Sequence, residues 1–232
     1  LRRVDTWRSA LLGAVSHDLR TPLASVKAAI SDLRSDHVDL TKEDSAELLE
    51  LIESQADRLD RLVTNLLDMT RIEFGELEVR KELTTLDKLV SETLDSFGGA
   101  DWTRRVAFSF PADLPSVYVD RLLVCQVIAN LLENAERHAP DGTPITIEAI
   151  PAGDLVEVAV EDEGPGVPVE ERTRIFKMFN RISGGGRAGI GLAIVSAFLD
   201  AHGQTVRVEQ SDKGGARFVF TLPVAGSTGS VM

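Results

Sequence analysis

The sequence predicts an α+β protein in which a helical hairpin precedes an α/β sandwich. Two observations lead to this prediction. Apolar residues recur at steps of three and four over residues 12–33 and again over 48–69, as on the buried face of a helix. Short runs of strand-forming residues, bounded by turn formers, fill much of the remainder. We expect the hairpin over residues 1–80, the sandwich over 81–226 and a flexible tail over 227–232.

The hairpin is predicted from two apolar seams. Residues 12–33 and 48–69 each repeat apolar side chains with coiled-coil spacing, and Pro22 and Gln55 each occupy one seam position. Between them, Thr41 and Asp44 have the spacing of a weak capping-box variant, which marks the start of the second helix. Two helices cannot bury such a seam alone, so we expect a second copy to complete a four-helix bundle.

The sandwich is expected to follow Gly75, which ends the second helix. Strands grouped in hairpins, with helices between them, predict one mixed or antiparallel sheet that has its helices on one face. The expected elements are an extended crossing at 77–86, helix 86–97, strand 105–111, a short strand leading into a long helix at 116–139, strands 144–150 and 155–162, helix 189–203 ended by Gly203, and strands 205–211 and 216–223.

Composition excludes several classes of partner. The net charge of −12 disfavours nucleic acid and anionic membrane surfaces, although a local pocket could still hold a small polyanion such as a nucleotide. The single cysteine, Cys125, forms no internal disulfide and fits a reducing cytoplasm. The chain has no run of about 18 apolar residues. It begins with Leu1 rather than methionine, so we expect a piece of a larger protein whose upstream region carries any membrane anchor.

One helical face gathers polar residues. Asn130, Asn134, Arg137 and His138 lie at positions i, i+4, i+7 and i+8 of the predicted helix. Amide oxygens can bind a divalent metal, and a cation can bind phosphate. An ordinary solvated helix face is the alternative interpretation.

A second group of residues follows the end of a predicted strand. Asp162 ends the strand, and Gly164 and Gly166 would let the backbone approach a flat ligand. A carboxylate at this position can accept a hydrogen bond from an exocyclic amine such as that of adenine. The alternative is a simple turn. Phe176 and Phe179 follow with helical spacing, for which core packing is the commoner explanation.

The third group is a glycine-rich loop, "GGGRAGIG", which leads directly into an apolar helix. Free backbone amides and the positive end of the helix dipole could hold phosphate oxygens there. A flexible linker is the alternative.

In their order and spacing, these motifs resemble those of the sensor histidine kinases of bacterial two-component systems, over essentially the whole chain. "SHDLRTPL" resembles the phosphoacceptor box, "NLLENAERH" the N box, "DEGPG" the first glycine box, "FKMF" the F box, "GIGLAIV" the second glycine box and "DKGGARFVFTLP" the closing glycine-bearing strand. "RLVTNLLDMTRIEFG" and "GGARFVFTLP" most resemble the potassium-sensor, Kdp-type subgroup. The resemblance implies an ATP-binding domain of the kinase–gyrase–chaperone type, a homodimer, a response-regulator receiver domain as partner, and the cytoplasmic portion of a plasma-membrane sensor.

The resemblance also implies roles in the phosphoacceptor box. His17 would be the nucleophile that accepts the γ-phosphoryl group, and Asp18 would orient its ring and take its proton. Thr21 would place a water for dephosphorylation of the regulator. The seam spacing puts His17 on the solvent-facing side of the helix. Pro22 lacks the amide that would bond to the Asp18 carbonyl, so we expect a bend there.

The implied cofactors are ATP and Mg²⁺. Asn134, together with Asn130, would bind Mg²⁺, and Asp162 would contact the adenine amine. ATP-hydrolysing relatives usually place a glutamate where Asn130 stands, so this chain is expected to hold ATP for transfer rather than hydrolyse it rapidly. The residues implied to contact ATP are Asn130, Asn134, Arg137, His138, Asp162, Gly164, Gly166, Phe176, Arg181, Arg187, Gly189, Gly191 and Leu192.

Two alternatives to a kinase remain open, and a third is disfavoured. The protein could act mainly as a phosphatase for its regulator, with Thr21 central. It could be a non-catalytic ATP-binding scaffold dimer, because Arg187 replaces the first glycine that the family often has in the second glycine box. An ATP-hydrolysing relative from the chaperone or topoisomerase side conflicts with Asn130.

Overall fold

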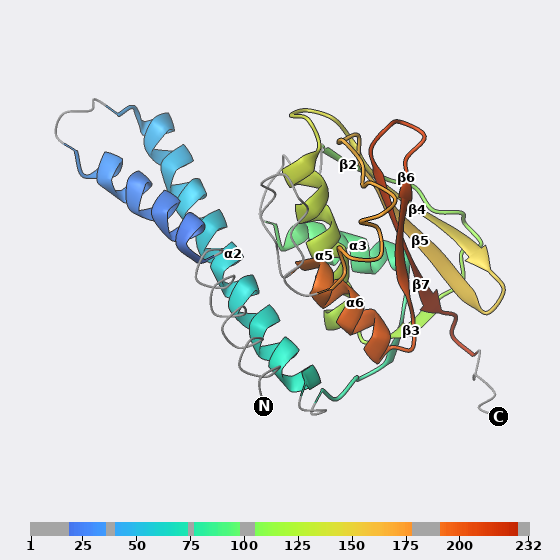
Figure 1. Ribbon diagram of the computed structural model, residues 1–232. Coiled ribbons are helices and arrows are strands. Elements are labelled where there is room, and N and C mark those ends of the chain that lie inside the picture. The colour runs from blue at the N-terminus through green and yellow to red at the C-terminus, as the bar shows by residue number, and fades with distance from the viewer. Residues whose placement is uncertain (1–18, 36–39, 74–76, 98–104, 178–190, 227–232) are drawn as a thin grey trace.

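The computed structural model contains a helical hairpin beside a two-layer sandwich (Figure 1). It describes residues 19–35, 40–73, 77–97, 105–177 and 191–226. The hairpin consists of a helix over residues 19–33 and α2, Lys42–Glu73. The predicted α+β class, with a helical N-terminal part, is confirmed. Within the described ranges, no helix combines the length and the hydropathy needed to cross a membrane.

The second helix of the hairpin starts at the predicted capping box. The Thr41 amide donates to Asp44 Oδ2 at 2.8 Å, and the Asp44 amide donates back to Thr41 Oγ1 at 3.0 Å. Pro22 is buried within the first helix, and the bend predicted at Asp18 lies outside the described residues.

The seams are only partly covered within one chain. Seam residues of α2 such as Leu48 and Leu59 are half-buried. Large apolar side chains of the hairpin remain exposed in the single chain: Leu23, Ile30, Leu49, Leu51, Val63 and Leu67. Pairing with a second copy therefore stays a prediction that this surface favours.

The main sheet has five strands in the order β2-β4-β5-β7-β6. Strand β2 is parallel to β4, and the other neighbours are antiparallel, so the predicted mixed sheet is confirmed. A separate pair, β1 with β3, was not predicted. The strands are β1 Glu82–Thr84, β2 Val106–Phe108, β3 Val117–Val119, β4 Ile145–Ala152, β5 Leu155–Glu161, β6 Val206–Gln210 and β7 Ala216–Pro223.

Three helices cover one face of this sheet: α3 Leu86–Asp95, α5 Arg121–His138 and α6 Gly191–Ala201 (Figure 1). Asp120 is the N-cap of α5. Gly203 follows α6 with φ +73°, the conformation that glycine adopts most readily after a helix. Residues 169–176 form successive turns instead of the helix that the spacing of Phe176 suggests, because their bonds mostly span three residues, as from the Glu171 amide to the Pro168 carbonyl.

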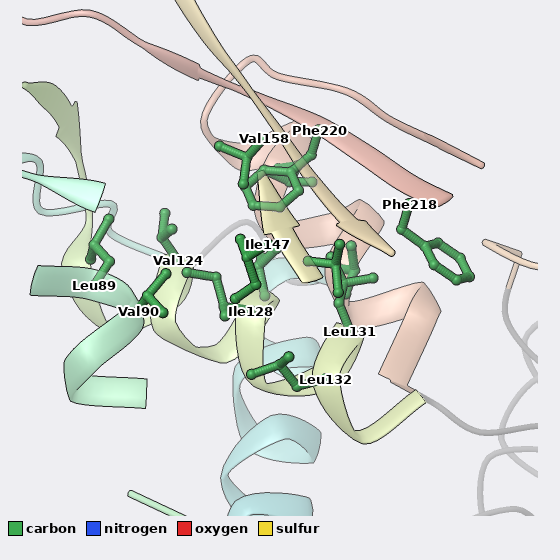
Figure 2. Close-up of a cluster of buried hydrophobic side chains, with 14 of the residues drawn as sticks. Leu89, Val90, Val124, Ile128, Leu131, Leu132, Ile147, Val158, Phe218 and Phe220 are labelled. Carbon is green, nitrogen blue, oxygen red and sulfur yellow. The ribbon is translucent and has the colours of Figure 1, made fainter. Parts of the chain in front are cut away.

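The core lies between these helices and the sheet (Figure 2). Burial of each large aliphatic or aromatic side chain contributes about 1.5–3 kcal/mol. This packing fixes α5 and α6 against the sheet and thereby positions their polar edges. The fully buried residues of the core include Leu89, Val90, Val124, Ile128, Leu131, Leu132, Ile147, Val158, Phe218 and Phe220.

Candidate functional site

Asp162 lies directly after β5 and is 2% exposed. Its Oδ1 accepts hydrogen bonds from the amides of Gly164 at 2.8 Å and Ala216 at 3.2 Å. The Asp162 amide in turn donates to the Ala216 carbonyl at 3.0 Å. Because both bonds to the carboxylate use Oδ1, Oδ2 is the oxygen left to accept a hydrogen bond from a ligand.

Glycines bring three segments close to this aspartate. A Cβ at Gly215 would lie 1.9 Å from the Asp162 carbonyl oxygen, and one at Gly164 would lie 2.8 Å from the carbonyl oxygen of His138. Gly166 has φ +72°, which a side chain would strain. The loop after β5 is thus held between the start of β7 and the end of α5. Gly215 was missing from the predicted site, although the Gly-Gly pair before the last strand was a usable signal.

A second contact ties the turn between β6 and β7 to the same strand end. The Ser211 hydroxyl donates to the buried carboxylate of Glu161, and the Lys213 amide donates to Ser211 Oγ at 2.9 Å. These bonds fix the backbone that supports Asp162. No comparable local signal marks Ser211, because its partner Glu161 is 50 residues away in the chain.

The polar edge of α5 faces the start of α6. Asn130 is 9% exposed, and its Nδ2 donates to the Gln126 carbonyl at 2.8 Å. Its Oδ1 would lie 2.8 Å from a Cβ at Gly191, the first residue of α6. Asn134 lies one turn further along the same edge of α5 and is half-buried. The structure therefore brings Asn130 and Gly191, two residues of the predicted site, close together.

The donors on this edge suit a magnesium ion bound together with phosphates. Amide oxygens are acceptable Mg²⁺ ligands, and Mg²⁺ in nucleotide sites takes most of its ligands from phosphate and water. Among the described residues, no group of three or more His, Cys, Asp or Glu could hold a metal by itself. The side-chain oxygen of Asn130 is directed toward the start of α6, and the start of a helix binds phosphates well. It therefore fits a site in which phosphates, water and the protein together supply the Mg²⁺ ligands.

Arg137 and His138 lie in the last turn of α5. Burial of the His138 ring, and next the charge of Arg137, lower the pKa of His138, while Asp162 acts in the opposite direction. His138 is therefore neutral near pH 7. Arg137 lines a cavity of about 390 Å³ between α2 and α5, together with Arg58 and Glu133. Glu133 and Arg137 thus face the hairpin, whereas Asn130 faces the start of α6.

Of the remaining predicted site residues, the structure describes Phe176, Leu192 and Thr21, and the others lie outside its described ranges. Phe176 packs edge-on against Phe218, with ring centroids 6.2 Å apart, so it forms part of the wall of the sandwich. Leu192 is half-buried in the first turn of α6, and Thr21 is half-buried in the helix over residues 19–33. His17, Asp18, Arg181, Arg187 and Gly189 lie outside the described residues.

Two family models match the chain. Residues 7–75 match the His Kinase A (phospho-acceptor) domain. Residues 119–226 match the histidine kinase-, DNA gyrase B- and HSP90-like ATPase. The second match includes Asn130, Asn134 and Asp162, and the first includes His17.

Curated relatives and solved structures agree with these matches. Sensor protein KdpD of Mycobacterium tuberculosis is 37% identical over 229 residues, which are 96% of this chain and 26% of that protein. Alginate biosynthesis sensor protein KinB of Pseudomonas aeruginosa is 34% identical, over 96% of this chain and 38% of that protein. The structure of full-length ShkA in complex with AMPPNP has 29% identity and a TM-score of 0.61, and covers 93% of this chain and 46% of ShkA. The chain thus spans about a quarter to two fifths of the length of these two curated relatives.

Proposed function

The chain belongs to the sensor histidine kinase family, with that family's phospho-acceptor and ATPase-type domains, and from this premise we propose that it is an ATP-dependent protein histidine kinase. His17 accepts the γ-phosphoryl group of ATP and then passes it to an aspartate of a response-regulator receiver domain. The observation that carries the proposal is the buried Asp162, whose Oδ1 is held by two backbone amides and whose Oδ2 remains for a ligand.

In the proposed site, the nucleotide lies along α5. Asp162 accepts a hydrogen bond from the adenine amine, and Gly164, Gly166 and Gly191 allow close approach of the backbone. Asn134 and Asn130 hold Mg²⁺, which would neutralise phosphate charge and orient the γ-phosphoryl group. Arg137, Arg181 and Arg187 supply further positive charge for the phosphates. His138, Phe176, Gly189 and Leu192 complete the proposed pocket.

The transfer itself is a substitution at phosphorus. A neutral imidazole nitrogen of His17 forms the N–P bond while the bond from the γ-phosphorus to the ADP oxygen breaks. Asp18 accepts the imidazole proton. Asn130 cannot deprotonate a water molecule, so water competes poorly with His17 for the phosphoryl group.

The same proposal covers assembly and location. Exposed apolar residues on the hairpin, such as Leu49 and Leu67, favour a homodimer that closes a four-helix bundle. We divide the chain into a phosphotransfer hairpin, residues 1–80, and an ATP-binding domain, residues 81–226. The names of the relatives, sensor proteins, support a place in the cytoplasmic portion of a membrane sensor.

Labelling with γ-³²P-ATP tests the function. We expect the protein to acquire label that is stable in base and labile in acid, as phosphohistidine is. The His17→Gln variant should acquire none and still bind nucleotide. Undiminished labelling of His17→Gln would sink the assignment of His17. Nucleotide binding without any labelling of the wild type would favour the scaffold alternative.

A further inference from the structure

Asp120 forms hydrogen bonds with three separate elements of the protein. It is 8% exposed and lies between β3 and α5. Its Oδ1 accepts from the amides of Leu122 at 3.1 Å and Leu123 at 3.3 Å, which makes it the N-cap of α5. An N-cap needs only one side-chain oxygen, and a serine would supply it equally well.

The second carboxylate oxygen reaches the segment that leaves the hairpin. The Arg80 amide donates to Asp120 Oδ2 at 2.8 Å, across 40 residues of sequence. Arg80 lies between the end of α2 at Glu73 and the start of β1 at Glu82. One carboxylate therefore joins the first turn of α5 to the segment that leads from the hairpin into the sandwich.

The main chain of Asp120 is held from a third element. Its amide donates to His202 Nε2 at 2.9 Å. His202 is 4% exposed and follows α6, and its Nδ1 lies 2.7 Å from the Phe198 carbonyl. A carbonyl only accepts, so Nδ1 carries the proton and Nε2 accepts from Asp120. The ring is therefore neutral.

Helices α5 and α6 consequently meet at two places. At one end of α5, Asp120 is bonded to His202, beyond the end of α6. Ten residues further along α5, the Asn130 oxygen lies against Gly191, at the start of α6. Between these places the two helices lie in contact (Figure 1), and both contribute residues to the core, such as Ile128 of α5 and Phe198 of α6. A displacement of the Arg80 segment can therefore be transmitted through Asp120 and α5 to the edge of α5 that carries Asn130 and Asn134.

We propose that Asp120 is a positioning residue that couples the segment leaving the hairpin to the nucleotide-binding edge of α5, with His202 holding its main chain. The inference rests on the proposed function, because it concerns the same nucleotide site. It assigns Asp120 a task beyond capping, since the cap uses Oδ1 and the coupling uses Oδ2.

The Asp120→Ser variant separates the two tasks. Serine keeps the N-cap, but its short side chain cannot also reach the Arg80 amide. The matched control is Asp113→Ser, which removes an exposed acid from a loop of the same sandwich. Hydrogen–deuterium exchange of the full chain is measured with and without a non-hydrolysable ATP analogue and Mg²⁺, for residues 77–84 and for residues 128–138.

In the wild type and in Asp113→Ser, we expect the nucleotide to slow exchange in both segments, by about threefold in residues 77–84. In Asp120→Ser, the slowing of 128–138 should remain and that of 77–84 should vanish. Equal slowing of 77–84 in Asp120→Ser and wild type would overturn the coupling. So would a wild type in which only 128–138 responds. A wild type in which neither segment responds would overturn the nucleotide site itself, and the coupling with it.

Discussion

Arg61 on α2 and Glu133 on α5 form an ion pair, with 3.2 Å between Arg61 Nη2 and Glu133 Oε1. The same guanidinium lies 5.0 Å from the centroid of the Phe97 ring, and its Nη1 donates to the Ser96 carbonyl at 3.5 Å. Both charged side chains are about three quarters buried. The pair joins the hairpin to the sandwich one residue before Asn134, so the position of the hairpin bears directly on the proposed nucleotide site.

Reversing the charge of Arg61 alone should weaken the contact between the hairpin and the sandwich. Arg61→Glu places two carboxylates together. We expect the contact between hairpin and sandwich to lose about 1 kcal/mol of stability, which lowers the ratio of docked to undocked molecules roughly fivefold. The double variant Arg61→Glu/Glu133→Arg should restore most of it. Small-angle scattering reports the change as an increased radius of gyration in Arg61→Glu. Arg58→Glu, which changes a neighbouring arginine of the same cavity, is the control. Equal scattering from Arg61→Glu and wild type would contradict the role of the pair.

Asp162→Asn should weaken nucleotide binding without unfolding the sandwich. Asparagine keeps an oxygen at the Oδ1 position for the amides of Gly164 and Ala216, and replaces Oδ2, the proposed acceptor for adenine, by a donor. We expect a loss of about 2 kcal/mol or more in binding free energy, roughly thirtyfold in Kd. Titration with a fluorescent ATP analogue measures it. The idea fails if Asp162→Asn binds with wild-type affinity.

Gly215→Ala should damage the same site by a steric route. The added methyl group would lie 1.9 Å from the Asp162 carbonyl oxygen, so one of the two segments must move. We expect a loss of about 2–3 kcal/mol in unfolding free energy and a matching loss of nucleotide affinity. Gly153→Ala is the control, because Gly153 has φ +66° and open space around it. That variant should lose only about 1 kcal/mol, with unchanged nucleotide binding.

The buried His202 predicts how stability depends on pH. Burial, opposed by the hydrogen bond with the Phe198 carbonyl, lowers the pKa of His202; Lys81 lowers it further and Asp120 raises it. The unfolded state therefore binds a proton first as pH falls, so this contribution is complete above about pH 6.5 and is lost as pH drops below it. Protonation of His202 Nε2 also removes the acceptor for the Asp120 amide.

The His202→Gln variant isolates this effect. Glutamine retains an acceptor near the Nε2 position and does not titrate, so its unfolding free energy should fall less than that of the wild type between pH 7.5 and 5.5. Urea unfolding at the two pH values measures the difference, and other groups, such as His138, cancel in the comparison. Parallel pH profiles for the two proteins would contradict the assignment.

Local signals were sufficient to predict most of the fold. The capping box at Thr41, the glycine after α6 and the run of strand-forming residues in β5 each act within a few residues, so the sequence displays them directly. The pairing of β1 with β3 was missed because it joins residues more than 30 positions apart without a connecting turn. The order of the five strands was likewise not predicted, since it depends on how helices and sheet pack in three dimensions.

The site was predictable to a similar extent. Asp162 and the asparagines of α5 were recognisable from motifs, because they stand at characteristic spacings within short stretches of sequence. The residues that support the site were not recognisable in this way. Ser211, Asp120 and His202 act through partners 50, 40 and 82 residues away in the sequence. Nothing in their immediate neighbours distinguishes them from ordinary turn or helix-end residues.

In the proposed reaction, the γ-phosphoryl group of ATP held at Asp162 and Asn134 passes to His17 rather than to water. The most direct test measures ADP released and phosphoryl label on the protein in the same time course, for wild type and His17→Gln. We expect one ADP for each label in the wild type during the first turnover, and almost no ADP from His17→Gln. ADP formation by His17→Gln at the wild-type rate would show a hydrolase and rule out this reaction.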